Sequence, residues 1–161
     1  MRRSTLSALV VSFFFAALLL LANPKPPLSV VVSPASQTVK SGADVTLKVT
    51  VRNTSSHELV FFDRIRICDY PIKIRDADGN QPPETAAKQQ SHCDRKPELD
   101  EARNILIRLN PGDSVDEEIT VSFYYDVRRT GTYTVQVSRH LPAEISKEDI
   151  PSNSVTFVVT E

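Results

Sequence analysis

One of the three histidines begins a stretch that is similar to the zinc-binding motif His-Glu-x-x-His. The stretch His57-Glu58-Leu59-Val60-Phe61 has a phenylalanine where the second histidine must stand. Two histidines one helical turn apart are needed to hold the metal. The polar residues 53–56 before it are typical of a turn rather than a helix. We therefore expect no metal site here.

The two cysteines, Cys68 and Cys93, are the next candidates for chemistry. An even number of cysteines in an exported chain favours a disulfide. Two separate thiols remain an alternative, as does a metal site with His57 and His92, although the CxxC and HxxxH spacings are missing. His92 and Cys93 are poorly placed as base and nucleophile, because adjacent residues on a strand point to opposite faces.

The acidic stretch Asp76-Ala77-Asp78-Gly79-Asn80 places side-chain oxygens at alternate positions, as calcium loops do. No bidentate acid follows at the twelfth position that such a loop requires. Asp-Gly is also a common turn sequence for backbone reasons. We interpret the stretch as a turn.

Four basic residues alternate with isoleucines in two neighbouring segments. If the segments pair, their outward side chains form a basic stripe for an acidic partner or a polyanionic glycan, and the alternative is an ordinary solvated face. Aromatic residues are not interleaved with them, and the formal net charge of the whole chain is only −1, so nucleic acid is not expected as a partner. The four residues are Arg64, Arg66, Lys73 and Arg75.

Other aromatic and polar motifs have simpler interpretations. Phe61-Phe62 and Tyr124-Tyr125 are expected in the core and at a corner rather than as sugar-binding platforms. Asn53-Thr54-Ser55 fits the pattern of a glycosylation sequon. That pattern matters only in a eukaryotic secretory pathway, and we give it little weight.

The N-terminus has the layout of a secretory signal peptide. Arg2 and Arg3 precede an apolar run from Leu6 to Ala22, and prolines follow it. We expect a signal helix over 1–22, cleaved after Ala22, with an uncleaved membrane anchor as the alternative, and a proline-rich linker over 23–27. The protein would then be secreted or periplasmic, or anchored with its domain outside the cytoplasm.

Segments of alternating apolar and polar residues, separated by turn sequences, follow the linker. This period of two is typical of antiparallel strands with one buried face. Short strands at such regular spacing predict an all-β fold, an immunoglobulin-like antiparallel β-sandwich of about seven to eight strands over 28–161. A long polar loop over 77–103 is expected to hold at most one helical turn. The predicted strands are approximately 28–34, 43–52, 58–67, 70–76, 104–109, 115–123, 131–138 and 153–160.

A tyrosine follows a glycine at the start of one predicted strand. Tyr133, after Gly131, can bury its ring and bond its hydroxyl back to the preceding corner. The alternation then places Tyr133 and Val135 in the core together with Val49 on a second strand. Immunoglobulin domains proper carry an inter-sheet disulfide at such positions, so here aliphatic packing replaces it. Cys68 and Cys93 must then hold another part, for which the long loop is the first candidate.

The C-terminal half carries a recognisable pattern in segments 109–114, 125–126, 130–137 and 152–156, and segment 49–55 adds to it. It resembles a group of uncharacterised secreted bacterial β-sandwich proteins and the non-catalytic N-terminal domain of deuterolysin-like (aspzincin) metalloendopeptidases. More distantly, it is similar to bacterial proteinase-inhibitor domains of immunoglobulin-like fold. The resemblance covers nearly all of 28–160 and implies a sandwich domain. No functional-site residues can be assigned to this sequence from the resemblance.

These observations favour an exported module without enzymatic activity, a catalytic residue or a cofactor. The expected partner is a protein or another component of the cell envelope, with membrane contact only through the N-terminal segment. A proteinase-inhibitor domain is the alternative. A glycan-binding module or an accessory domain of a hydrolase is less favoured.

Overall fold

The structure is a computed structural model that describes residues 25–91, 93 and 105–161. The signal helix expected over 1–22 lies outside the described residues. Nine strands and three short helical segments make up the described part. In chain order they are β1 (Leu28–Pro34), β2 (Thr38–Lys40), β3 (Thr46–Asn53), β4 (Leu59–Asp63), α1 (Arg66–Asp69), β5 (Ile72–Arg75), α2 (Ala86–Gln89), β6 (Ile105–Leu109), β7 (Ser114–Thr120), the 3-10 turn η1 (Val121–Phe123), β8 (Gly131–Arg139) and β9 (Ile150–Thr160).

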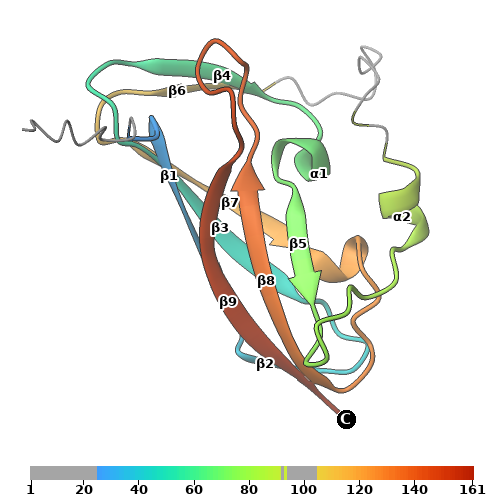
Figure 1. The fold of residues 1–161 in the computed structure, drawn as a ribbon. Coiled ribbons are helices and arrows are strands. Elements are labelled where there is room, and N and C mark those ends of the chain that lie inside the picture. Colours follow the sequence, from blue (N-terminus) through green and yellow to red (C-terminus); the bar gives the residue numbers. More distant parts are fainter. Residues whose placement is uncertain (1–24, 92, 94–104) are drawn as a thin grey trace, which may run out of the picture.

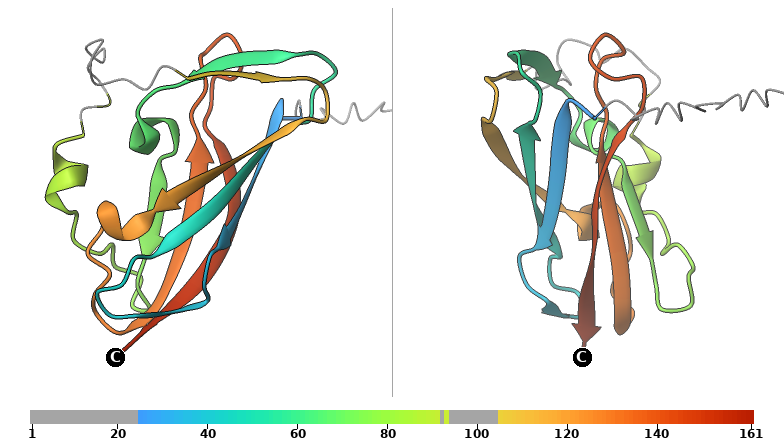
Figure 2. Two further views of the ribbon diagram at one scale, coloured as in Figure 1. Left: turned by 180° about the vertical axis from the view of Figure 1, so that it is seen from behind. Right: turned by 60° about the vertical axis from the view of Figure 1, so that its left-hand side comes forward.

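Two sheets face each other, and a two-stranded ribbon lies across one end of them (Figures 1 and 2). The first sheet is antiparallel, in the order β1-β3-β7. The second has the order β2-β9-β8-β5, in which only the short β2 runs parallel to its neighbour. The ribbon pairs β4 with β6. The expected all-β sandwich is confirmed.

The core lies between the two larger sheets, where the alternating side chains turn inward. Val49 and Val135 are fully buried, and Tyr133 is almost so. Thr134, between the last two, is exposed. The prediction of which residues on these strands face the core is therefore confirmed. Burial of apolar area between the two sheets stabilises this sandwich, which has no tryptophan.

A side-chain amide joins the two sheets at the β1–β9 edge. The side chain of Asn153 on β9 accepts a hydrogen bond from the backbone amide of Val32 at 2.9 Å. It also donates one to the backbone carbonyl oxygen of Val32 at 3.0 Å. The Asn153 side chain thus bonds both backbone groups of Val32, as the opposite residue does in a hydrogen-bonded pair of antiparallel strands. This edge of the sandwich is closed without a backbone ladder.

Several predicted boundaries were wrong. The predicted strand 58–67 ends at Asp63, and the chain then turns into α1. The predicted strand 115–123 ends at Thr120, where η1 begins, and the predicted strand 153–160 begins three residues earlier. The short β2 was not predicted. A period of two in apolar residues cannot tell a strand from a short helical turn when the run has only a few residues.

The described part of the expected long loop contains a turn and a single helical turn. The side chain of Asp76 accepts hydrogen bonds from the backbone amides of Asp78 and Asn80, so the acidic stretch forms a turn as expected. Thr85 caps α2 by accepting from the amide of Lys88. The rest of the predicted loop, apart from Cys93, lies outside the described residues.

Candidate functional site

The tyrosine corner is present, and its role is structural. The Tyr133 hydroxyl donates to the carbonyl oxygen of Arg129 at 2.7 Å, and its ring stacks on Phe157 with centroids 5.3 Å apart. Gly131 has a φ of 146°, a conformation that side chains disfavour. The Tyr133 and Phe157 rings lie in the core, so they stabilise the fold.

The two cysteines form the expected disulfide. Cys68 and Cys93 are bonded, with their Cα atoms 5.3 Å apart. Cys68 lies in α1, and Cys93 follows α2. The bond therefore ties the loop that contains α2 to the helical turn between β4 and β5. The alternatives of free thiols and of a metal ligand pair are excluded.

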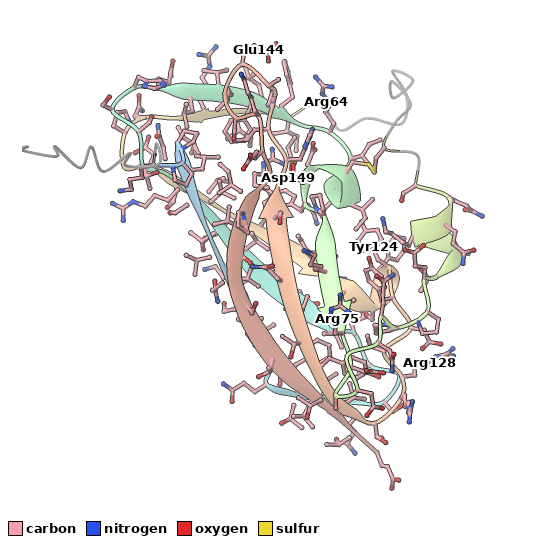
Figure 3. All side chains as sticks on the ribbon, in the orientation of Figure 1. Arg64, Arg75, Tyr124, Arg128, Glu144 and Asp149 are labelled. Carbon is pink, nitrogen blue, oxygen red and sulfur yellow. A yellow bond between two sulfur atoms is a disulfide. The ribbon has the colours of Figure 1, made fainter. Side chains whose placement is uncertain are left out.

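The predicted basic stripe is not formed, because β4 and β5 belong to different sheets. Arg64 and Arg75 lie far apart along the molecule (Figure 3). Arg66 is part of α1 and pairs with Glu117 at 3.0 Å. Lys73 and Arg75 point to solvent from the open edge strand of the second sheet.

A buried arginine that sequence reasoning missed lies where the ribbon meets the second sheet. Arg139, the last residue of β8, is 1% exposed. One terminal nitrogen, Nη1, lies 3.4 Å from the Asp63 carboxylate and 3.9 Å from that of Asp69. The other, Nη2, donates to the carbonyl oxygen of Phe62 at 3.4 Å. The guanidinium carbon also lies 4.4 Å from the ring centroid of Tyr70, a cation–π contact.

Burial in this cluster shifts the pKa of two ionisable groups, Asp69 and Tyr70. Desolvation raises the pKa of Asp69, against the opposing effects of the Arg64 amide and the Arg139 charge. Burial also raises the pKa of the Tyr70 phenol. Perturbed groups often mark functional sites, but structural ion pairs cause the same shifts. Because solvent barely reaches Arg139, we interpret this cluster as an anchor for the ribbon.

A second buried polar side chain anchors the other end of the ribbon. Asn53 is 1% exposed, and its side-chain nitrogen donates to the carbonyl oxygens of His57 and Leu109, each at 2.8 Å. These bonds join β3 to the turn before β4 and to the last residue of β6. They also leave the sequon asparagine unavailable for glycosylation in the folded protein, since its nitrogen is buried and bonded.

The outer face of the ribbon is apolar and exposed. Val60 and Phe62 on β4 are 37% and 45% exposed, and Leu106, directly opposite Phe62 on β6, is 44% exposed. The Arg64 guanidinium carbon lies 6.0 Å from the Phe62 ring centroid. Arg108, opposite Val60, pairs with Glu58 at 3.7 Å. We call Val60, Phe62 and Leu106 the ribbon face.

An open groove of about 1040 Å³ borders the ribbon on the side of β8 and β9. One wall is the stretch His57–Val60, and the other is the connection 144–151 between β8 and β9. The residues 25–27 complete it. Figure 3 shows Glu144 and Asp149 at this end of the molecule, beside the ribbon.

A smaller cavity of about 440 Å³ lies at the opposite end. Its lining includes Asp44, Glu84 and Asp126, but Asp126 is bonded to Arg128 at 2.6 Å. Within the described ranges, no group of three or more His, Cys, Asp or Glu residues could hold a metal ion. No helix long and apolar enough to cross a membrane occurs among the residues described.

The aromatic pairs are divided between core and surface. Phe61 and Tyr125 are buried as expected, whereas Phe62 is exposed on the ribbon face and Phe123 is 59% exposed on η1. Tyr124, which is half-buried, meets the Phe123 ring edge-on at 5.1 Å. The expectation of core positions was therefore wrong for Phe62, because β4 turns only its odd-numbered residues inward.

No protein-family model and no curated protein matches the sequence. Among solved structures, a β-glucosidase of Erythrobacter marinus is similar over 83% of this chain and 15% of its own, at 13% identity and a TM-score of 0.42. A β-glucosidase of Listeria innocua in complex with glucose is similar over 83% of this chain and 16% of its own, at 16% identity and a TM-score of 0.37. The chain thus spans about a sixth of these enzymes, and the likeness carries no conclusion about activity.

Proposed function

We propose that this protein is an exported, non-enzymatic module that binds another protein through the ribbon face. The observation that carries the proposal is the exposure of Val60, Phe62 and Leu106 side by side on one face. Clustered exposed apolar side chains on a small domain mark interaction sites. Aromatic residues and arginine are enriched where proteins meet, and here Arg64 lies over the Phe62 ring.

The two anchors of the ribbon support the same proposal. Asn53 holds one end through two backbone carbonyls, and Arg139 holds the other through Phe62 and Asp63. A surface that is already fixed in its binding conformation loses little conformational entropy when a partner docks. The inward faces of both strands pack on the core through Leu59, Phe61 and Leu109.

Export is supported by two features. The disulfide Cys68–Cys93 is typical of oxidising compartments outside the cytoplasm. The apolar run from Leu6 to Ala22 after two arginines has the layout of a signal peptide.

Photo-crosslinking tests the proposal. A crosslinking amino acid replaces Phe62 in one full-length variant and Val31, an equally apolar residue that is 54% exposed on β1, in another. We expect a discrete protein adduct in the native host only from position 62, and we expect Leu106→Asp to abolish it. The same adducts from both positions, or none from position 62, would contradict the proposal. Inhibition of a protease panel by the purified domain would instead favour the inhibitor alternative.

A further inference from the structure

The groove beside the ribbon carries an inference about the kind of partner, which rests on the proposed protein-binding function. We infer that the groove takes an extended, basic peptide segment of the partner, which adds as a strand to the open edge of β4. Three features of the groove favour such a segment: the backbone groups that face it, the charge of its walls and its apolar floor.

The open edge of β4 faces the groove. In an antiparallel pair, the backbone groups of successive residues point alternately toward the partner strand and away from it. The Phe62 carbonyl oxygen accepts a bond from Arg139 and so points away from β6. Val60 lies two residues from Phe62 on the same strand, so its amide and carbonyl groups also point away from β6. Val60 and Glu58, the residue before β4, both line the groove. Among the described residues, no hydrogen bond reaches the Glu58 backbone groups.

The carbonyl oxygen of His57 is already bonded to the Asn53 side chain, on the inner side of the turn. An extended peptide can therefore pair with the two residues Glu58 and Val60, which together offer two donors and two acceptors. Strand addition of this kind takes its affinity from main-chain hydrogen bonds and its specificity from alternate side chains.

The walls of the groove carry more acidic than basic side chains. Four carboxylates line it, those of Glu58, Glu144, Glu148 and Asp149, against the ammonium groups of Lys25 and Lys147. Two carboxylates are already engaged, since Glu58 pairs with Arg108 and Asp149 lies 2.7 Å from the ring of His140. In the described part of the chain, Glu144 and Glu148 have no ion-pair partner, and neither do Lys25 and Lys147. Lysine or arginine side chains of a bound segment would meet these two carboxylates.

The floor of the groove is apolar. Leu59 and Ile150 are buried at its base, and Ile145 is half-buried between the acidic residues of the wall. In an added strand, successive side chains point to opposite faces. One set of side chains would then rest on this floor, and the other would reach the carboxylates. The fitting segment alternates basic with apolar residues.

Fluorescence anisotropy of labelled peptides tests the inference on the exported protein. The probes are a (Lys-Val)4 peptide, a (Glu-Val)4 peptide, and a (Lys-Val)4 peptide with alternate backbone nitrogens methylated. We expect the first to bind with an affinity that weakens as salt is added, and the other two to bind at least tenfold more weakly. Equal binding of the lysine and glutamate peptides would overturn the charge argument, and equal binding of the methylated peptide would overturn strand addition.

A pair of double variants locates the site. Glu144→Lys with Glu148→Lys should weaken binding of the (Lys-Val)4 peptide at least tenfold. Glu118→Lys with Glu161→Lys makes the same charge change on exposed residues outside the groove and should change affinity less than twofold. Equal loss in both would overturn the assignment to the groove. If the peptide fails to bind while position 62 still crosslinks, the groove inference alone is wrong. If the peptide binds and position 62 gives no adduct, the ribbon face is wrong.

Discussion

At the scale of single residues, the molecule depends on a few buried polar side chains. Arg139 lies among two carboxylates, two aromatic rings and the carbonyl oxygens of Phe62 and Asp69. Its Nε is the one buried side-chain nitrogen or oxygen of the described residues without a hydrogen-bond partner. Such a cluster contributes little net stability when complete, but losing one member is costly because the others remain buried and charged.

Replacement of Arg139 tests this role. Arg139→Ala leaves Asp63 and Asp69 buried without a countercharge, so we expect it to lower the free energy of unfolding by about 3–5 kcal/mol. Arg108→Ala breaks only the exposed pair with Glu58 and should cost about 0–1 kcal/mol. Urea unfolding of both variants measures the difference. Similar losses in the two variants would show that the buried cluster is not an anchor.

The pair Asp126–Arg128 gives a pH prediction. Hydrogen bonds from the Arg128 side chain and backbone lower the pKa of Asp126 to about 2. An unfolded aspartate has a pKa of about 4. The pair therefore adds to the free energy of unfolding above that pH, and this contribution is lost as the pH falls toward 2.

Carboxyl NMR titration measures the effect. Arg128→Ala should raise the pKa of Asp126 toward its usual range without restoring it fully, because the backbone amide of residue 128 still donates to the carboxylate. The pKa of Asp116 should stay lowered in the same variant, because its cause is the Thr50 hydroxyl together with Lys48. An unchanged Asp126 pKa would show that Arg128 is not the cause.

At the scale of elements, the register of β8 can be tested directly. Val135 is fully buried and Thr134 is exposed on the other face of the same strand. We expect Val135→Ala to lower the free energy of unfolding by about 1–3 kcal/mol, since it removes buried methyl groups and leaves a cavity. Thr134→Ala should change it little. Thermal or urea unfolding of both variants is the measurement, and equal, small effects would mean that the strand lies in another register.

The sequence was most informative where the period of two was long. The strands around Val49 and Val135 were predicted with the correct buried face, as was the Tyr133 hydroxyl bond to the preceding corner. The disulfide followed from cysteine count and the signal-like N-terminus. All of these depend on local pattern or on residue type, which a single sequence contains.

The ribbon and its anchors could not be predicted in this way. The isoleucines 65 and 67 continue the alternation of β4, so the turn into α1 had no local signal. Arg139 sits at an inward position of β8, where the pattern has only apolar residues before it. Its burial depends on Asp63 and Asp69, which are more than 65 positions away in the sequence. Such long-range compensation of charge is visible only in three dimensions.

At the scale of the whole molecule, two sheets and a ribbon are held by three kinds of link. Asn153 closes the edge between the sheets, Asn53 and Arg139 fix the ribbon, and the disulfide ties α1 to the segment after α2. The ribbon face and the groove lie at one end of the molecule, where the connections 54–58, 64–71 and 140–149 also lie (Figures 1 and 2). The opposite end carries the chain's C-terminus (Figure 1).

The disulfide links the whole fold to the compartment in which it forms. Closing a loop of 25 residues stabilises a protein by about 3.5 kcal/mol in the chain-entropy model. We expect the full-length chain, expressed with its N-terminus, to be recovered outside the cytoplasm with a first residue near Asn23 and with both thiols unreactive to alkylation. Deleting residues 2–22 should retain the protein in a reducing cytoplasm, where Cys68 and Cys93 should both be alkylated and the midpoint of urea unfolding should fall. N-terminal sequencing and mass spectrometry of the non-reduced protein make the comparison. A full-length protein that begins at Met1 in the cytoplasm, or alkylation of both thiols in the exported form, would contradict the prediction.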